Sequence, residues 1–279
     1  MNAAIAALPR LHAITDDRVI ARGDVLARAE TLARTAGSAL AVHVRSRALP
    51  GGPLLKLAGE LRDLIGPFGA WLVVNDRADV ARITRARALV SGRGGLGVAD
   101  ARKAAPHALI ARSVHDGAEV RVALAESADF LVAGSVFATA SHPERAAAGI
   151  GLVSEAAGGA APVIAIGGVT PERTAEVIAA GAWGVAAIRA LWDADDPAAA
   201  ARAFLSALPA GDTYGVVVNG EEQRVRRGIT LAGLLSDLSL DPREVVVEHN
   251  RRIVRRDALA TTGVGEGDKV ELVHFVGGG

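Results

Sequence analysis

Between residues 11 and 206 the chain alternates short, nearly uninterrupted apolar runs with Ala-rich stretches whose apolar positions recur at helical spacing. Parallel strands give such continuous runs when both of their faces are covered. The runs are residues 11–15, 39–44, 70–75, 88–92, 108–114, 129–135, 162–168 and 184–190. Eight units of strand followed by helix predict a (β/α)8 TIM barrel, an α/β fold.

The pattern changes after a segment with Pro and Gly at 208–215. Two strands around an Asn-Gly turn are expected first, then an amphipathic helix capped by Thr230, and then further short strands that end in KVELVHFV. This order is that of the β-grasp (ubiquitin-like) α+β fold. We therefore expect a barrel domain at 1–207, a linker at 208–213 and a β-grasp domain at 214–279. The helix is expected over 230–240.

Composition narrows the classes of function. The 31 basic and 31 acidic residues balance, and no Lys/Arg stripe is interleaved with aromatic residues, which argues against a nucleic-acid partner. No run approaches the roughly 18 to 20 uncharged apolar residues of a membrane helix, and the first residues do not resemble a secretory signal. We expect a soluble, cytoplasmic protein without a membrane partner. The lack of Cys excludes thiol nucleophiles and thiolate metal sites. The oligomeric state, including a homo-oligomer, is left open.

The C-terminal unit resembles the ThiS-type sulfur-carrier proteins of thiazole biosynthesis. The resemblance is carried by VNGEE, TLAGLL, VVVEHN, IVRRD and the terminal GDKVELVHFVGGG. It implies that Gly278 and Gly279 enter a partner's active site, because glycines without Cβ atoms pass through a narrow tunnel. It also implies that an E1-like adenylating enzyme activates the Gly279 carboxylate, which then becomes a thiocarboxylate and donates sulfur to thiazole synthase.

The barrel resembles the superfamily of thiamine phosphate synthase and the TenI thiazole tautomerase. The motifs that carry this are VHVRSR, VNDRADVA, RSVHD, GSVFATASHP, VIAIGGVTPE and GVAAIRALW. All of them fall at the carboxyl ends of predicted strands, where barrel enzymes build their active sites. The substrate-binding residues expected from these motifs are Arg45, Arg47, Asn75, Ser113, Thr139 and Ser141.

A phosphate site is expected at the ends of the seventh and eighth strands. Gly167 and Gly168 expose the backbone just before a helix that opens at Thr170, and helix amino termini attract anions. With Ala187 and Ile188 they form the phosphate cradle that is common in barrels. The resemblance assigns this cradle to the phosphate of a thiazole phosphate.

Departures from the synthase pattern affect the expected reaction. The synthase joins a pyrimidine pyrophosphate to the thiazole phosphate and uses Mg²⁺, a cation that prefers carboxylate oxygens. Asp76 matches the first metal-binding aspartate, but Gly94 and Gly95 stand near the place of the second. The chain departs from the synthase pattern at three other motif positions. His43 replaces the usual glutamine, and Arg47 and His142 replace the usual lysines.

These departures favour the tautomerase, which aromatises thiazole carboxylate phosphate by moving a proton and needs no cofactor. Histidine suits such acid–base work near neutral pH. His115 matches the family's histidine, His142 and His43 are further catalytic candidates, and Arg45 is expected to hold the substrate carboxylate. His12 is expected to pack in the core.

Other functions remain open on the sequence. The barrel could be an active Mg²⁺-dependent synthase with Asp76 as a metal ligand, or an inert scaffold for the carrier. The β-grasp unit could be a modifier that is conjugated to lysines. In the favoured interpretation the carrier supplies sulfur to thiazole synthase and the barrel acts on that enzyme's product, so thiazole synthase would bridge the two domains.

Overall fold

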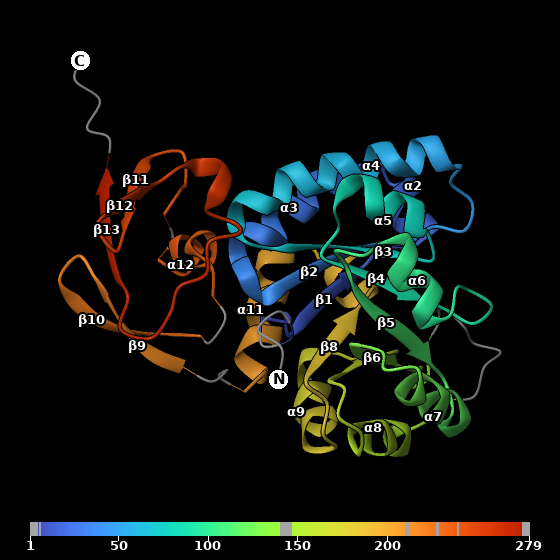
Figure 1. The fold of residues 1–279 in the computed structure, drawn as a ribbon. Coiled ribbons are helices and arrows are strands. Elements are labelled where there is room, and N and C mark those ends of the chain that lie inside the picture. The colour runs from blue at the N-terminus through green and yellow to red at the C-terminus, as the bar shows by residue number, and fades with distance from the viewer. Residues whose placement is uncertain are drawn as a thin grey trace.

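The computed structural model describes residue 5 and residues 7–139, 147–209, 213–226, 229–238 and 240–274. A closed barrel of eight parallel strands, covered outside by helices, lies beside a separate five-stranded sheet with its own helix (Figure 1). The expected fold class, a (β/α)8 barrel followed by a β-grasp domain, is confirmed.

The barrel strands pair in sequence order, and β8 closes the barrel by pairing with β1. Every expected apolar run contains a strand. The strands are β1 (Leu11–Ile14), β2 (Leu40–Val44), β3 (Trp71–Asn75), β4 (Ala88–Ser91), β5 (Leu109–Val114), β6 (Phe130–Ala133), β7 (Val163–Ile166) and β8 (Gly184–Ala187).

Helices follow the strands and cover the outside of the barrel (Figure 1). Carboxylates cap three of them: Asp16 accepts from the Val19 amide, Asp116 from the Glu119 amide, and Asp196 from the Ala199 amide. In the described part of the chain, no helix is both long and apolar enough to cross a membrane. The helices are α2 (Asp17–Ala21), α3 (Val25–Ala36), α4 (Gly51–Ile65), α5 (Ala78–Thr84), α6 (Val98–Ala104), α7 (Gly117–Ala125), α8 (Ile150–Ala157), α9 (Pro171–Ala179), α10 (Arg189–Trp192) and α11 (Pro197–Ala207), with 3₁₀ turns η1 (Gly37–Ala39) and η2 (Gly66–Phe68).

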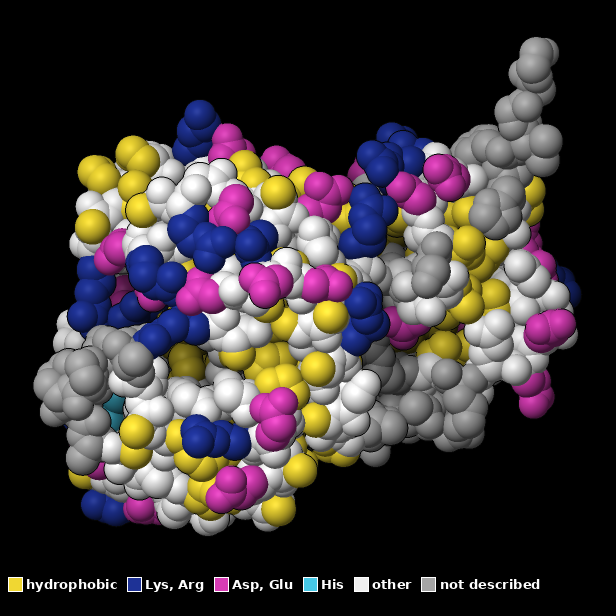
Figure 2. All heavy atoms as spheres, turned by 180° about the vertical axis from the view of Figure 1, so that it is seen from behind, with side chains coloured by type: hydrophobic (Ala, Val, Ile, Leu, Met, Phe, Trp, Pro, Cys, Tyr) yellow, Lys and Arg dark blue, Asp and Glu magenta, His cyan; other side chains and the backbone are white. Residues whose placement is uncertain are grey.

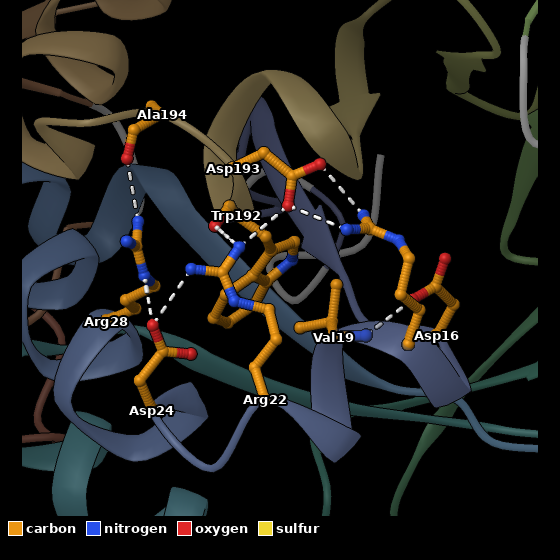
Figure 3. A network of polar contacts seen from close by, with 9 residues as sticks. Asp16, Val19, Arg22, Asp24, Arg28, Trp192, Asp193 and Ala194 are labelled. Atoms are coloured by element: carbon orange, nitrogen blue, oxygen red, sulfur yellow. Dashed lines mark hydrogen bonds and ion pairs between the residues drawn. The ribbon is translucent and has the colours of Figure 1, made fainter.

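A polar network fixes the barrel where its last unit meets its first (Figure 3). Asp193, directly after α10, accepts hydrogen bonds from Arg18 at 2.9 and 3.0 Å and from Arg22 at 2.8 Å. Arg22 also donates to Asp24, which accepts from Arg28 as well. The network therefore holds α2 and α3 against the segment that follows β8, and so supports the loop that carries Ile188.

The C-terminal domain orders its sheet β10-β9-β13-β11-β12, with β13 parallel to β9 and the other pairs antiparallel. Its core contains Leu231, Leu234 and Leu235 of α12, packed against strand valines. Thr230 caps α12 as expected, by accepting from the Gly233 amide, but the helix ends at Asp237 and is shorter than the expected 230–240. The elements are β9 (Thr213–Val218), β10 (Glu221–Arg226), α12 (Leu231–Asp237), β11 (Val245–His249), β12 (Arg252–Val254), η3 (Arg256–Ala258) and β13 (Lys269–His274).

Helix α12 also joins the two domains, because it packs on α3, η1 and η2 of the barrel. The backbones approach closely there: a Cβ atom on Gly69 would lie 2.9 Å from the Gly233 amide nitrogen, and one on Gly37 would lie 2.9 Å from Ser236 Cβ. Arg34 of α3 stacks on Phe68 and lies 3.9 Å from Asp241. Since η1 and η2 directly precede β2 and β3, the joint lies at the amino-terminal end of the barrel.

We expect Gly69→Ala to loosen this joint. Gly69 has φ of 75°, and the added methyl group would press on the backbone of Gly233. Gly23→Ala is the matched control, because Gly23 has φ of 79° and open space around the position of a Cβ atom. Both variants carry the backbone strain of about 1 to 3 kcal/mol, but only Gly69→Ala carries the clash. Small-angle scattering should show a larger radius of gyration for Gly69→Ala alone. Equal scattering by the two variants would contradict a close-packed joint.

Candidate active site at the carboxyl ends of the barrel strands

A cavity of about 670 Å³ opens at the carboxyl ends of the barrel strands. Asn75 of β3, Ile166 of β7 and Ala187 of β8 line it, and each is the last residue of its strand. Its volume is in the range that holds a small-molecule ligand. The cavity therefore lies at the end of the barrel opposite to the joint with the C-terminal domain.

One wall of the cavity is formed by a turn after β7 whose residues have no side chains. Gly167 and Gly168 line the cavity with φ of 101° and 63°, a region that favours glycine. The nine-residue helix α9 begins three residues after Gly168, and Ile188 follows β8 beside it on the cavity wall. Exposed backbone and a helix amino terminus together form an anion site. The four residues expected for phosphate, Gly167, Gly168, Ala187 and Ile188, all line the cavity.

Five arginines line the same cavity: Arg45, Arg47, Arg93, Arg173 and Arg189. Figure 2 shows Lys and Arg side chains gathered beside a hollow in the barrel. Arg173 donates to the Gly168 carbonyl and stacks on Phe137, which places it next to the phosphate cradle.

Arg45 and Arg47 follow β2. Burial, and then the charge of Arg47, lower the pKa of Arg45 below its usual value, although a guanidinium stays charged at neutral pH. Among the described residues neither side chain forms a direct ion pair, although the charges of Asp76, Asp16 and Asp17 favour the charged form of Arg45 from a distance. Such groups bind phosphate or carboxylate strongly.

His115 is held in one orientation by Glu119. The His115 Nδ1 atom lies 2.9 Å from Glu119 Oε2, and the same oxygen accepts from the His115 backbone amide at 2.8 Å. Arg93 donates to the other carboxylate oxygen at 2.5 Å. Burial alone would raise the pKa of Glu119, but the hydrogen bonds from His115 and Arg93 outweigh it and lower that pKa. Glu119 thus stays ionised and holds Nδ1 of His115. The Nε2 atom of His115, a residue that lines the cavity, is left to contact a ligand.

The loop after β4 provides no carboxylate. Asp76 has φ of 62° and accepts from the Gly92 amide at 2.7 Å, and it is not part of the cavity wall. A Cβ atom on Gly95 would lie 3.4 Å from Asp76 Oδ1. An acidic side chain at position 95 would therefore lie beside Asp76. Gly94 and Gly95 have no side chain and supply no carboxylate ligand for a metal ion. Among the described residues, no group of three or more His, Cys, Asp or Glu could hold a metal ion.

His43 does not lie where expected. Its ring is fully buried and does not line the cavity, and burial, followed by the nearby His12, lowers its pKa well below the usual value. The ring meets His12 and Asn75, so the structure does not bring His43 together with the residues that line the cavity. His12 packs in the barrel interior, as expected.

The other predicted residues divide into two sets. Ser113, Thr139, Asn75 and His115 line the cavity. Ser141, His142, Gly278 and Gly279 lie outside the described residues. The sequence analysis missed Arg93, Arg173, Arg189 and Glu119. Glu119 lies in the first turn of α7, whereas His115 precedes the capping residue Asp116, so this pair depends on how the chain enters the helix.

Comparisons with known proteins agree with this architecture. The family described as thiamine monophosphate synthase matches residues 11–191, and the ThiS family matches residues 216–279. A thiamine-phosphate synthase of Mycobacterium bovis is 40% identical over 225 residues, which cover 76% of this chain and all of the relative. One of Methanoculleus marisnigri is 38% identical over 209 residues, covering 74% of this chain and 98% of the relative. The solved thiamine phosphate pyrophosphorylase of Pyrococcus furiosus superposes with a TM-score of 0.64 at 26% identity, over 73% of this chain and 96% of that one.

Proposed function

The chain belongs to the thiamine monophosphate synthase family, and from this premise we propose that it serves thiamine biosynthesis and that its barrel is a thiamine-phosphate synthase fused to a sulfur carrier. The names of the relatives favour this reaction over the tautomerisation that the sequence analysis preferred. The synthase forms a bond between a thiazole phosphate and a pyrimidine while the bond from the pyrimidine to its pyrophosphate breaks.

The geometric observation that carries the proposal is the presence of two cationic regions in one cavity. The glycine cradle with Arg173 suits the monophosphate of the thiazole. Arg45 and Arg47, after β2, suit a second, more highly charged group such as pyrophosphate, whereas Arg93, after β4, also lines the cavity but is paired with Glu119 and Asp116. Guanidiniums aimed at a departing pyrophosphate stabilise the charge that develops on it.

The fit for Mg²⁺ is poor in the described residues. Asp76 is the only acid of the expected pair, and it is already bonded to the Gly92 amide. A hard divalent cation is usually held by several oxygen ligands. In the proposed reaction the arginines therefore stabilise the charge of the departing pyrophosphate.

Pyrophosphate release tests the proposal. The purified chain would receive pyrimidine pyrophosphate and thiazole phosphate, with Mg²⁺ in one arm and EDTA in the other, beside an authentic synthase. We expect release in both arms, with less dependence on Mg²⁺ than the authentic enzyme shows. No release in either arm, with phosphate ligands still bound, would overturn the synthase and leave the tautomerase or an inert scaffold.

Gly95→Asp should create the missing half of a metal site. The new carboxylate would stand beside Asp76. The φ angle at this position is not in the left-handed region, but the added Cβ atom would lie 3.2 Å from the Gly92 carbonyl oxygen, so the loop must shift slightly. We expect Mg²⁺ to raise the rate of pyrophosphate release in this variant more than in the wild type. Gly95→Asn is the control of similar shape without the charge. Equal Mg²⁺ responses in the two variants would contradict this prediction.

A tautomerase is the second candidate, and the fixed His115–Glu119 pair favours it. A histidine whose Nδ1 is held by an ionised carboxylate can take and return a proton through Nε2. The same cavity would hold the thiazole phosphate in the glycine cradle, and its carboxylate against Arg45. This reaction needs neither the second carboxylate nor a cofactor.

For the ThiS domain we propose the role of sulfur carrier, with Gly279 as the thiocarboxylate. Its partners would be an E1-like adenylating enzyme and thiazole synthase. Intact mass after incubation with ATP, sulfide and such an adenylating enzyme would show a sulfur-for-oxygen increment. A gain of a whole protein's mass would instead indicate a modifier conjugated to lysines, and pull-down by each isolated family domain would test whether thiazole synthase bridges them.

A further inference from the structure

A row of buried hydrogen bonds crosses the barrel interior and ends at the cavity. His12 Nε2 lies 2.9 Å from the Pro9 carbonyl oxygen, and His12 Nδ1 lies 2.8 Å from His43 Nε2. In the structure, Asn75 Oδ1 then lies 3.2 Å from His43 Nδ1. Both rings are fully buried, whereas Asn75 lines the cavity.

The Pro9 carbonyl oxygen determines which ring nitrogens in this row of hydrogen bonds carry protons. The Pro9 carbonyl oxygen can only accept, so His12 Nε2 must carry a proton. Burial lowers the pKa of His12 to about 4, although the bond to Pro9 opposes this shift, so the ring is neutral at pH 7 and its Nδ1 carries no proton. His43 Nε2 must therefore donate to it. His43 is neutral for the same reason, and its Nδ1 is left as an acceptor.

An acceptor at His43 Nδ1 requires a donor from Asn75. The oxygen and nitrogen of an amide have nearly the same shape, so hydrogen bonding decides which one faces a neighbour. An amide oxygen facing His43 Nδ1 would put two lone pairs together, at a buried position where this is costly. The tautomers therefore require the opposite of the drawn orientation: a half-turn of the amide puts the nitrogen against His43 Nδ1 and the oxygen on the other side.

We propose that the His12–His43 pair fixes the Asn75 amide with its oxygen toward the cavity, so that the ligand must place an N–H or O–H donor against it. The end of β3 is then a subsite for a donor group of the ligand, such as an amino group on a heterocycle, and not for a phosphate oxygen. Asn75 is a specificity-determining residue, and His12 and His43 are positioning residues. The donor part of this inference rests on the proposed function, whereas the amide orientation does not.

Nitrogen NMR of the full-length protein labelled with ¹⁵N-histidine tests the orientation without any ligand. At pH 7 we expect both rings to be neutral with the proton on Nε2, and Nδ1 to show the shift of an unprotonated ring nitrogen. His43→Gln would assign the signals. A proton on His43 Nδ1, or a charged His12 at this pH, would overturn the proposal whatever the barrel catalyses.

A pair of ligands tests the specificity. Thiamine phosphate and oxythiamine phosphate differ in one substituent of the pyrimidine ring, an amino group against a carbonyl oxygen. We expect the wild type to bind the amino compound about 5- to 10-fold more tightly in calorimetry. His43→Gln, which can still donate to His12 and accept from Asn75, should keep this preference. His43→Leu, which frees the amide to rotate, should lose it.

The outcomes separate the two ideas. Expected tautomers with equal binding of the two ligands would overturn the donor subsite but keep the amide orientation. Expected tautomers with no binding of either ligand would contradict the synthase and not the hydrogen-bonded row. Equal preference in the His43→Leu and His43→Gln variants would show that the pair does not position Asn75.

Discussion

Gly167→Ala is expected to weaken phosphate binding by about 10- to 100-fold, whichever reaction the barrel catalyses. Gly167 has φ of 101°, and an added Cβ atom would lie 2.6 Å from Ser135 Cα. The turn after β7 must then shift, and the amides that face a phosphate shift with it. Backbone strain of about 1 to 3 kcal/mol should also lower the free energy of unfolding. Calorimetry with thiazole phosphate would measure the binding, and chemical denaturation would measure the stability.

Gly23→Ala is the control that separates the effect of backbone strain from damage to the phosphate site. It carries a similar positive φ, at a position away from the cavity where a Cβ atom meets nothing within 4 Å. We expect this control to lose stability while it binds thiazole phosphate like the wild type. If Gly167→Ala bound the ligand as well as Gly23→Ala does, the glycine turn after β7 would not be the phosphate site.

The fold could be predicted from the sequence because its signals are local. Each run such as 70–75 is apolar throughout, and only a buried parallel strand explains eight of these runs in alternation with helical stretches. The end of α12 could not be predicted, because the apolar spacing continues to residue 240. Its Leu240 instead packs against the core of the C-terminal domain beyond the helix.

The site could be predicted in part. The glycines after β7 and the arginines after β2 were identified because their motifs follow strands directly. Burial misled the assignment of His43: both faces of a strand in a barrel are covered, so the sequence does not show which side chains point to the ligand. The bond between Arg93 and Glu119 could not be predicted, because it depends on how the loop after β4 reaches α7.

The joint with the C-terminal domain and the cavity lie at opposite ends of the barrel. Helix α12 is held against η1 and η2 at the amino-terminal end, and the cavity opens at the other end. Among the described residues of the C-terminal sheet, Ile253 and Val273 are 72% and 60% exposed. In the proposed function, a thiazole synthase bound at these residues would leave the barrel cavity open, as a bridging enzyme requires.

His115→Ala is expected to separate the two candidate reactions. If the barrel aromatises the thiazole, loss of the acid–base group should lower that rate by about 10²- to 10⁴-fold. Pyrophosphate release should change far less, because in the proposed synthase its charge is stabilised by Arg45 and Arg47 and not by a proton from His115. Both rates would be measured on the same preparation, one by absorbance of the aromatic ring and the other by a coupled pyrophosphate assay.

Glu119→Gln is the companion variant, because it keeps the shape but removes the charge that fixes His115 Nδ1 and pairs with Arg93. A positioning role predicts a smaller loss of aromatisation than in His115→Ala, together with a shift in the pH profile of that reaction. If both rates fell equally in both variants, His115 and Glu119 would support the cavity wall and move no proton. In that case, of the described residues that line the cavity, the glycine cradle and the arginines would remain, and these suit the synthase better than the tautomerase.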